Sequence, residues 1–172
     1  MAGKSTLKNY QANILERLEE AKKVGSAAPA GYLGVIIAGK HILVNMQEIS
    51  ETLPLMEIYP VPLVKPWFLG VANVRGVLYA INDIGQLLNG AATTVTSSAR
   101  VLLMSDEVTS HVAFLVEKLV GLRKLEGMQK VSDTLEHAFC MHHDVYEDQD
   151  GNQWMVLDCM KLVQSKEFIQ SY

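Results

Sequence analysis

The sequence has few cysteines. Its 172 residues contain two, Cys140 and Cys159, and these lie too far apart to form a CxxC pair. Small secreted domains that depend on disulfides carry several cysteines at short spacings. The scarcity argues against a disulfide scaffold and predicts a protein of the reducing cytoplasm.

Long hydrophobic runs are also missing. The most apolar stretch, GYLGVIIAG at residues 31–39, is much shorter than the roughly 20 residues that span a bilayer. The first residues lack the continuous apolar segment of a signal peptide. We therefore expect a soluble, cytoplasmic protein that meets a membrane only indirectly.

Basic residues are fewer than acidic residues. Lys and Arg number 15 against 19 Asp and Glu, which gives a net charge of −4. Proteins that bind nucleic acid or anionic lipid attract them with clustered basic residues. Here the basic residues are scattered along the chain, so we expect no nucleic-acid partner.

Motifs of the common enzyme classes are absent as well. The sequence has no GxSxG elbow, no GxxxxGK[ST] phosphate loop and no GxGxxG dinucleotide loop. We therefore expect no catalytic residue, no cofactor and a function other than that of an enzyme.

One cluster of potential metal ligands remains. Residues 137–144 read HAFCMHHD and hold His137, Cys140, His142, His143 and Asp144. In a strand, Cys140, His142 and Asp144 would share a face, and these residue types bind zinc. No second CxxC or HxxxH completes a tetrahedral set, so we expect no metal ligand. A metal-binding enzyme or sensor at His137–Asp144 stays as the alternative hypothesis.

Hydrophobic residues, by contrast, make up 49% of the chain, enough for a sizeable core. Apolar residues recur at steps of three and four over 5–24, which predicts an amphipathic helix, and GSAAPAG at 25–31 is a small-residue linker. We expect a helix and linker over 1–30 and the main domain over 31–168.

The main domain is dominated by short β-type runs. Prolines 54, 60, 62 and 66 predict an edge strand and an extended loop, because proline cannot donate to a sheet. Residues 111–125 read as one long strand that bends, and 158–170 as a closing helix. Many short strands with regular turns favour barrels over a parallel sheet.

The chain also contains a short internal repeat. GVLYAINDIGQLL at 76–88 matches GNQWMVLDCMKLV at 151–163 at a constant offset, since 151 − 76 and 158 − 83 both equal 75. Each copy combines a glycine turn, a strand with an aromatic residue and an acidic helix cap. The repeat predicts two similar β lobes, with Asp83 and Asp158 as structural helix caps.

An arginine lies between two apolar runs in the stretch PWFLGVANVRGVLYAINDIGQLLNG, residues 66–90. The planar guanidinium of Arg75 is suited to pair with a carboxylate or carbonyl groups of a partner. It is equally suited to satisfy a carboxylate of its own chain, such as Asp83. The residues alone leave both interpretations open.

This stretch resembles the CheW family of chemotaxis adaptors, which carries an Asn-Leu-Arg-Gly step, a strand and an Asp that begins a helix. Here the pattern is Asn73-Val74-Arg75-Gly76, then VLYAIN, then Asp83. ILVNMQEI, IYPVP and GNQWMVLDCMKLV resemble other CheW segments in the same order. KPWFLGVANVRGVLY is most similar to the PilI branch, the CheW-like adaptors of type IV pilus systems.

The resemblance implies a fold and a function. The fold is mainly β, with two SH3-like five-stranded β-barrel lobes on a shared core, plus an N-terminal helix and a short C-terminal helix. The function is that of a non-enzymatic adaptor at receptor arrays on the inner membrane. Such adaptors couple a methyl-accepting chemoreceptor to the regulatory domain of a CheA-type histidine kinase, here in the control of type IV pili and twitching motility. A scaffold that joins receptors without contacting a kinase fits the sequence equally well.

The resemblance also implies a partner-binding site. Arg75 matches the family arginine and is expected at the receptor groove, while Asn73, Val74 and Gly76 are expected to shape its strand and turn. The sequence gives no comparable indication for the surface that contacts the kinase.

Overall fold

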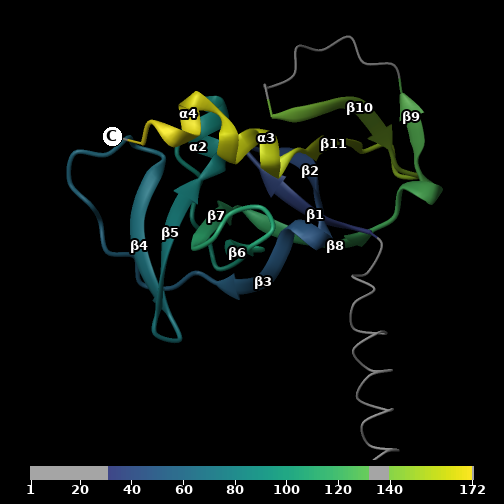
Figure 1. The fold of residues 1–172 in the computed structure, drawn as a ribbon. Coiled ribbons are helices and arrows are strands. Elements are labelled where there is room, and N and C mark those ends of the chain that lie inside the picture. The colour runs from purple at the N-terminus through teal and green to yellow at the C-terminus, as the bar shows by residue number, and fades with distance from the viewer. Residues whose placement is uncertain (1–30, 132–139, 172) are drawn as a thin grey trace, which may run out of the picture. The chain divides into compact units, whose positions relative to one another are not determined.

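The computed structural model describes residues 31–131 and 140–171. The expected helix over 5–24 and most of its linker lie outside these residues. The predicted mainly β architecture with two lobes is confirmed (Figure 1). Among the described residues, no helix is both long enough and apolar enough to cross a bilayer.

The strands form two sheets. The first has the order β8 (Lys118–Arg123), β1 (Tyr32–Ile37), β2 (Lys40–Asn45), β11 (Gln153–Leu157), β10 (Met141–Glu147) and β9 (Gln129–Val131). The second has the order β3 (Ile49–Pro54), β6 (Arg100–Met104), β7 (Val112–Val116), β5 (Val77–Asp83) and β4 (Phe68–Val74). The helical segments are η1 (Met46–Glu48), α2 (Ile84–Asn89), η2 (Leu125–Gly127), α3 (Cys159–Gln164) and α4 (Lys166–Ile169).

The two sheets repeat one strand arrangement. In the second sheet, the antiparallel pair β6–β7 lies beside β5, which runs parallel to β7. In the first sheet, the antiparallel pair β1–β2 lies beside β11, which runs parallel to β2. Ala80 is opposite Val112 in one sheet, and Met155, 75 residues after Ala80, is opposite Ile42 in the other. The short sequence repeat thus marks equivalent strands of the two lobes.

The long strand expected over 111–125 is instead two strands. β7 ends at Val116 and belongs to the second sheet, whereas β8 begins at Lys118 and belongs to the first. Between them, the N–H of Glu117 donates to the carbonyl of Ile36 at 3.0 Å. The chain passes from one lobe to the other at this residue, a change that strand propensity does not reveal.

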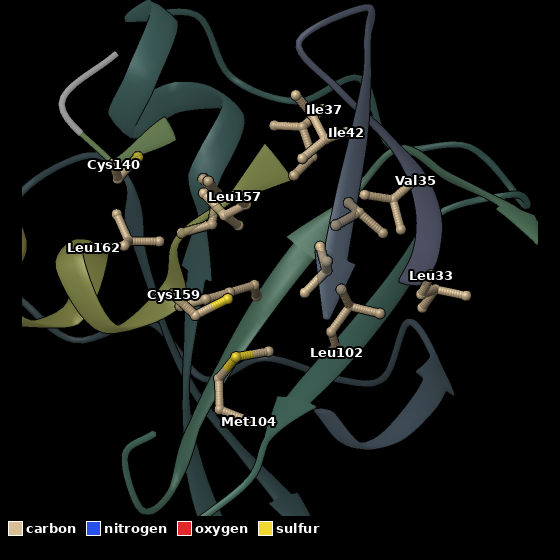
Figure 2. Packing of buried hydrophobic residues seen from close by; sticks show 14 of the residues in the cluster. Leu33, Val35, Ile37, Ile42, Leu102, Met104, Cys140, Leu157, Cys159 and Leu162 are labelled. Carbon is tan, nitrogen blue, oxygen red and sulfur yellow. The ribbon is translucent and has the colours of Figure 1, made fainter. Parts of the chain in front are cut away.

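A shared apolar core joins the lobes. Buried side chains of β1 and β2 meet those of β6, β7, α2 and α3 in one cluster. Figure 2 shows Leu102 and Met104 of β6 gathered around the same interior as Cys159 and Leu162 of α3. Separate smaller clusters fill the second lobe, around Ile81 and Leu115, and the first lobe, around Trp154.

The proline-rich segment lies as its prolines predict. Pro54 ends the outer strand β3, and the chain then continues to β4 as a loop that contains turns at 62–63 and 66–67. On the way, Tyr59 exchanges two backbone hydrogen bonds with Val71 of β4, at 2.8 and 2.9 Å. Gly70 makes this approach possible: its φ is +137°, and a Cβ there would collide with the carbonyl oxygen of Tyr59.

We therefore expect Gly70→Ala to lower the free energy of unfolding by about 2 kcal/mol or more, because it combines a backbone collision with an unfavourable φ. Urea unfolding followed by circular dichroism measures the change. Gly127→Ala is the matched control, since a Cβ at Gly127 would have no neighbour within 4 Å. Equal stability of the two variants would contradict this account of the contact.

The β10–β11 turn is organised around one carboxylate. Asp148 accepts hydrogen bonds from the indole Nε1 of Trp154 at 2.8 Å, from the N–H of Asn152 at 2.9 Å and from the N–H of Asp150 at 3.0 Å. The hydrogen bond from Trp154, followed by those from Asn152 and Asp150, lowers the pKa of Asp148 from 3.8 to about 2. These donors stabilise the ionised form of Asp148. The hydrogen bond from Trp154 also links the turn to a buried side chain of the core.

A depressed carboxyl pKa in the folded state stabilises the fold above the unfolded-state pKa, and this contribution is lost as the pH falls through the folded-state pKa. For Asp148 the loss occurs between about pH 4 and pH 2. We expect the free energy of unfolding to fall more steeply over this range in the parent protein than in Asp148→Asn. Urea titrations at a series of pH values measure the slopes, and equal slopes would contradict the prediction.

Candidate functional site

The candidate site lies at the tip of the β4–β5 hairpin. Val74 pairs with Val77, so Arg75 and Gly76 form a two-residue loop. Their φ angles are +53° and +87°, the signature of a type I′ turn. The side-chain oxygen of Asn73 accepts a hydrogen bond from the N–H of Gly76 at 2.8 Å. The family-like tetrapeptide therefore builds a rigid turn that presents the arginine.

Arg75 pairs with Glu51, not with Asp83. Its two terminal nitrogens donate to the two carboxylate oxygens of Glu51, at 2.7 and 2.6 Å. The hydrogen bonds from Arg75 lower the pKa of Glu51. The side chain of Arg75 is nevertheless 71% exposed. Arg75 therefore pairs with a carboxylate of its own chain, as one of the two interpretations expected, but the suggestion that this carboxylate is Asp83 is wrong. The exposed part of the side chain remains accessible to another protein.

Two exposed apolar side chains stand next to the turn. Val77 is 40% exposed and Leu78 is 57% exposed. An exposed arginine beside apolar side chains is typical of interface hot spots. Sequence reasoning missed these residues and Glu51. Alternation along β5 could have indicated Leu78, because Tyr79 and Ile81 point into the lobe core.

The other family-matched residues of the turn offer a partner less side chain than Arg75 does. Val74 is 9% exposed and belongs to the core of the second lobe. Asn73 holds the turn and Gly76 supplies a positive φ. Arg75, with the longest and a largely exposed side chain, is therefore the residue of this tetrapeptide best placed to contact a partner.

Asp83 and Asp158 are helix N-caps in equivalent places. Asp83 accepts from the N–H of Gln86 at 3.0 Å, and Asp158 accepts from the N–H of Lys161 at 2.9 Å. Asp83 is 1% exposed and also accepts from the N–H and hydroxyl of Thr93, at 2.7 and 2.6 Å. Its lone pairs are used within the protein, as a structural role requires.

The histidine cluster is not assembled as a metal site. His137 lies outside the described residues, and within them no group of three His, Cys, Asp or Glu side chains is placed to hold a metal. Cys140 is buried, His142 is exposed, and Asp144 pairs with Lys130 at 2.7 Å. A register shift between Met141 and Val145 interrupts the alternation that would have aligned them. The alternative metal hypothesis gains no support.

The two cysteines lie in the shared core. Burial raises the pKa of Cys140 to about 11, and burial followed by the neighbouring Glu48 carboxylate raises that of Cys159. Both thiols are 0% exposed. Neither has the lowered pKa or the access that a nucleophilic cysteine needs.

We expect both thiols to resist iodoacetamide at neutral pH while the protein is folded, because they are buried and protonated. After unfolding in guanidinium chloride, two thiols should react. Mass spectrometry counts the adducts. Rapid labelling of either cysteine in the folded protein would contradict the burial described here.

Comparison with known proteins agrees with this architecture. Residues 31–167 match the family described as CheW-like domain. The chain belongs to the CheW-like family. It is 26% identical over 140 residues to Protein PilI of Pseudomonas aeruginosa, an alignment that covers 80% of this chain and 77% of PilI. The family consists of scaffold and adaptor proteins and not of enzymes.

The CheW-like fold is also seen in a solved structure. The crystal structure of scaffolding protein TtCheW from Thermoanaerobacter tengcongensis superimposes with a TM-score of 0.66 at 10% identity. The match covers 81% of this chain and 95% of that one. At this identity the likeness concerns the fold alone.

Proposed function

We propose that this CheW-like protein couples a methyl-accepting chemoreceptor to the regulatory domain of a CheA-type histidine kinase. Its pathway controls type IV pili and twitching motility, and it works in the cytoplasm at receptor arrays on the inner membrane. Family membership supports the adaptor role, and similarity to PilI supports the pilus pathway.

The mechanism is positioning. An adaptor that binds two partners at once raises the effective concentration of one near the other. If it binds one receptor conformation more tightly, the difference in affinity becomes a coupling free energy that changes kinase output. Such a protein needs specific surfaces and no reacting group.

The observation that carries the receptor site is the exposed, preorganised Arg75. The type I′ turn fixes its backbone, and Glu51 holds its guanidinium in place. A guanidinium has five N–H donors, and a carboxylate of the receptor would accept from those that do not face Glu51. The exposed Val77 and Leu78 would add apolar contact.

We expect Arg75→Asp to weaken receptor binding roughly tenfold or more, because it replaces the cation with a like charge opposite the receptor carboxylate. Binding of the kinase regulatory domain should not change. Calorimetric titration with a soluble receptor signalling fragment, and separately with the kinase domain, measures the two affinities. Aspartate tolerates the positive φ at this position, so the fold should survive.

Lys40→Asp is the matched control, because Lys40 is an exposed cation at a hairpin turn of the other lobe. Lys40→Asp should leave the affinity for the receptor fragment unchanged. Loss of the circular dichroism spectrum in Arg75→Asp would mean that the arginine is structural. Binding of the receptor without the kinase would indicate a scaffold between receptors, and binding of neither would overturn the proposed function.

A further inference from the structure

A polar contact joins the crossing between the two lobes to the closing helix α3. The segment η1 carries the chain from β2 of the first sheet to β3 of the second. The carbonyl of its last residue, Glu48, accepts from the N–H of Ser105, just after β6, at 2.9 Å. The side-chain carboxyl of Glu48 lies against the thiol of Cys159, the first residue of α3. Glu48 therefore contacts the crossing, the end of β6 and the start of α3.

The carboxyl of Glu48 is poorly solvated as an anion. Its Oε2 atom is buried and has no hydrogen-bond partner within the described part of the chain. Burial raises the pKa of Glu48 above its ordinary value of 4.5, and this outweighs the thiol of Cys159 and the backbone of Asn45, which lower it. A buried carboxylate oxygen without a donor costs free energy that the neutral acid largely avoids.

Titratable groups from three elements face this carboxyl. Asp158, the N-cap of α3, is a second carboxylate, and it disfavours the anion of Glu48. His142 of β10 favours that anion when it is protonated, and Tyr32 of β1 also faces Glu48. The Nε2 of His142 and the Nζ of Lys161 lie 3.8 and 3.7 Å from the carboxylate of Asp158. Because both basic side chains lie beside Asp158, a proton on Glu48 is the direct way to relieve the repulsion between the two carboxylates.

The far end of α3 is fixed by contacts that do not titrate. Ser165 ends α3 and caps α4, accepting from the N–H of Phe168 at 3.2 Å. Phe168 stacks on Trp67 with ring centroids 5.4 Å apart. The charge of Glu48 should therefore act on the first turn of α3 and not on its end.

The equivalent helix of the other lobe has a different neighbour at its cap. In α2, Asp83 accepts from the N–H of Gln86 at 3.0 Å and from the hydroxyl of Thr93 at 2.6 Å. In α3, Asp158 accepts from the N–H of Lys161 at 2.9 Å and faces the Glu48 carboxyl. Since the two caps make the same backbone hydrogen bond, α2 is an internal reference for an effect of Glu48 on α3.

We propose that Glu48 is a pH-sensitive latch, a contact between η1 and α3 that is strong when its carboxyl is protonated and weak when it is ionised. The neutral carboxyl is buried against Cys159 without repelling Asp158, so the first turn of α3 is held on η1. Loss of the proton leaves a buried anion without a partner, and the first turn of α3 then opens more often. This response to acidity requires no partner and does not depend on the proposed function.

The pH dependence expected of Glu48 is opposite in sign to that of Asp148. A carboxyl whose pKa is raised in the folded state contributes its full stabilisation below the unfolded-state pKa, and the contribution is lost as the pH rises through the folded-state pKa. For Glu48 the loss begins above about pH 4.5. Glu48→Gln keeps the shape of the neutral acid and removes the titration, so this variant should not show the loss.

The latch is tested first in the parent protein. Nuclear magnetic resonance of the ¹³C,¹⁵N-labelled full chain follows the carboxyl carbon of Glu48 and the hydrogen exchange of the Lys161 and Leu162 amides over a series of pH values. We expect the carboxyl carbon to titrate with a midpoint above 4.5. The protection of both amides, corrected for the intrinsic exchange rate, should fall with the same midpoint, and that of the Gln86 amide should not. A midpoint at or below 4.5, or α3 protection that does not follow the carboxyl, would overturn the proposal.

The effect is then assigned to the charge of Glu48. In Glu48→Gln, the protection of the Leu162 amide should stay constant over the pH range in which the parent protein loses it. Glu126→Gln is the matched control, because Glu126 is an exposed glutamate in the other short helical segment, η2, and this variant should lose α3 protection as the parent does. If Glu48→Gln still loses protection at the parent midpoint, another group controls the opening of α3 and the proposal is wrong.

Discussion

Strands β6 and β7 bury both of their faces, and this constraint determines which surface remains for a partner. Val101 and Leu115 point into the second lobe, whereas Leu102 and Phe114 point into the core shared with the first lobe. Two apolar faces require a near-continuous hydrophobic run, which RVLLM and VAFLV provide. The hydrophobic side chains of β4 and β5 take no part in the core shared with the first lobe, and Val77 and Leu78 of β5 stay exposed.

β4 and β5 are joined by a turn whose backbone conformation is restricted and whose arginine is exposed. A type I′ turn matches the twist of its flanking strands, so Arg75 is held in one backbone conformation. Its pairing with Glu51 joins the outer strand β3 to the tip of the hairpin at the opposite side of the sheet. Solvent screens so exposed a pair, and its effect lies in orienting the guanidinium more than in stabilising the fold. Preorganisation of this kind reduces the ordering that binding requires.

Local patterns predicted local structure well and long-range contacts poorly. The repeat around Asp83 and Asp158 was visible because turn, strand and cap lie within a dozen residues. The partner of Arg75 was not, because Glu51 is 24 residues away and meets it only when the lobe closes. The break at Ser165 was missed because KEFI continues the helical pattern, and only the contacts of Phe168 show why the chain turns.

The two sheets differ in where their strands lie in the sequence. All strands of the second sheet lie between residues 49 and 116, whereas the first combines β1 and β2 with strands that begin only at residue 118. During synthesis, the second sheet can complete its pairings while β1 and β2 are still an isolated hairpin, which is marginal in water. The parallel pairing of β2 with β11 closes a loop of more than a hundred residues, since Ile42 meets Met155. Contacts of such high sequence separation slow folding, so the lobe that carries Arg75 is the one able to form early.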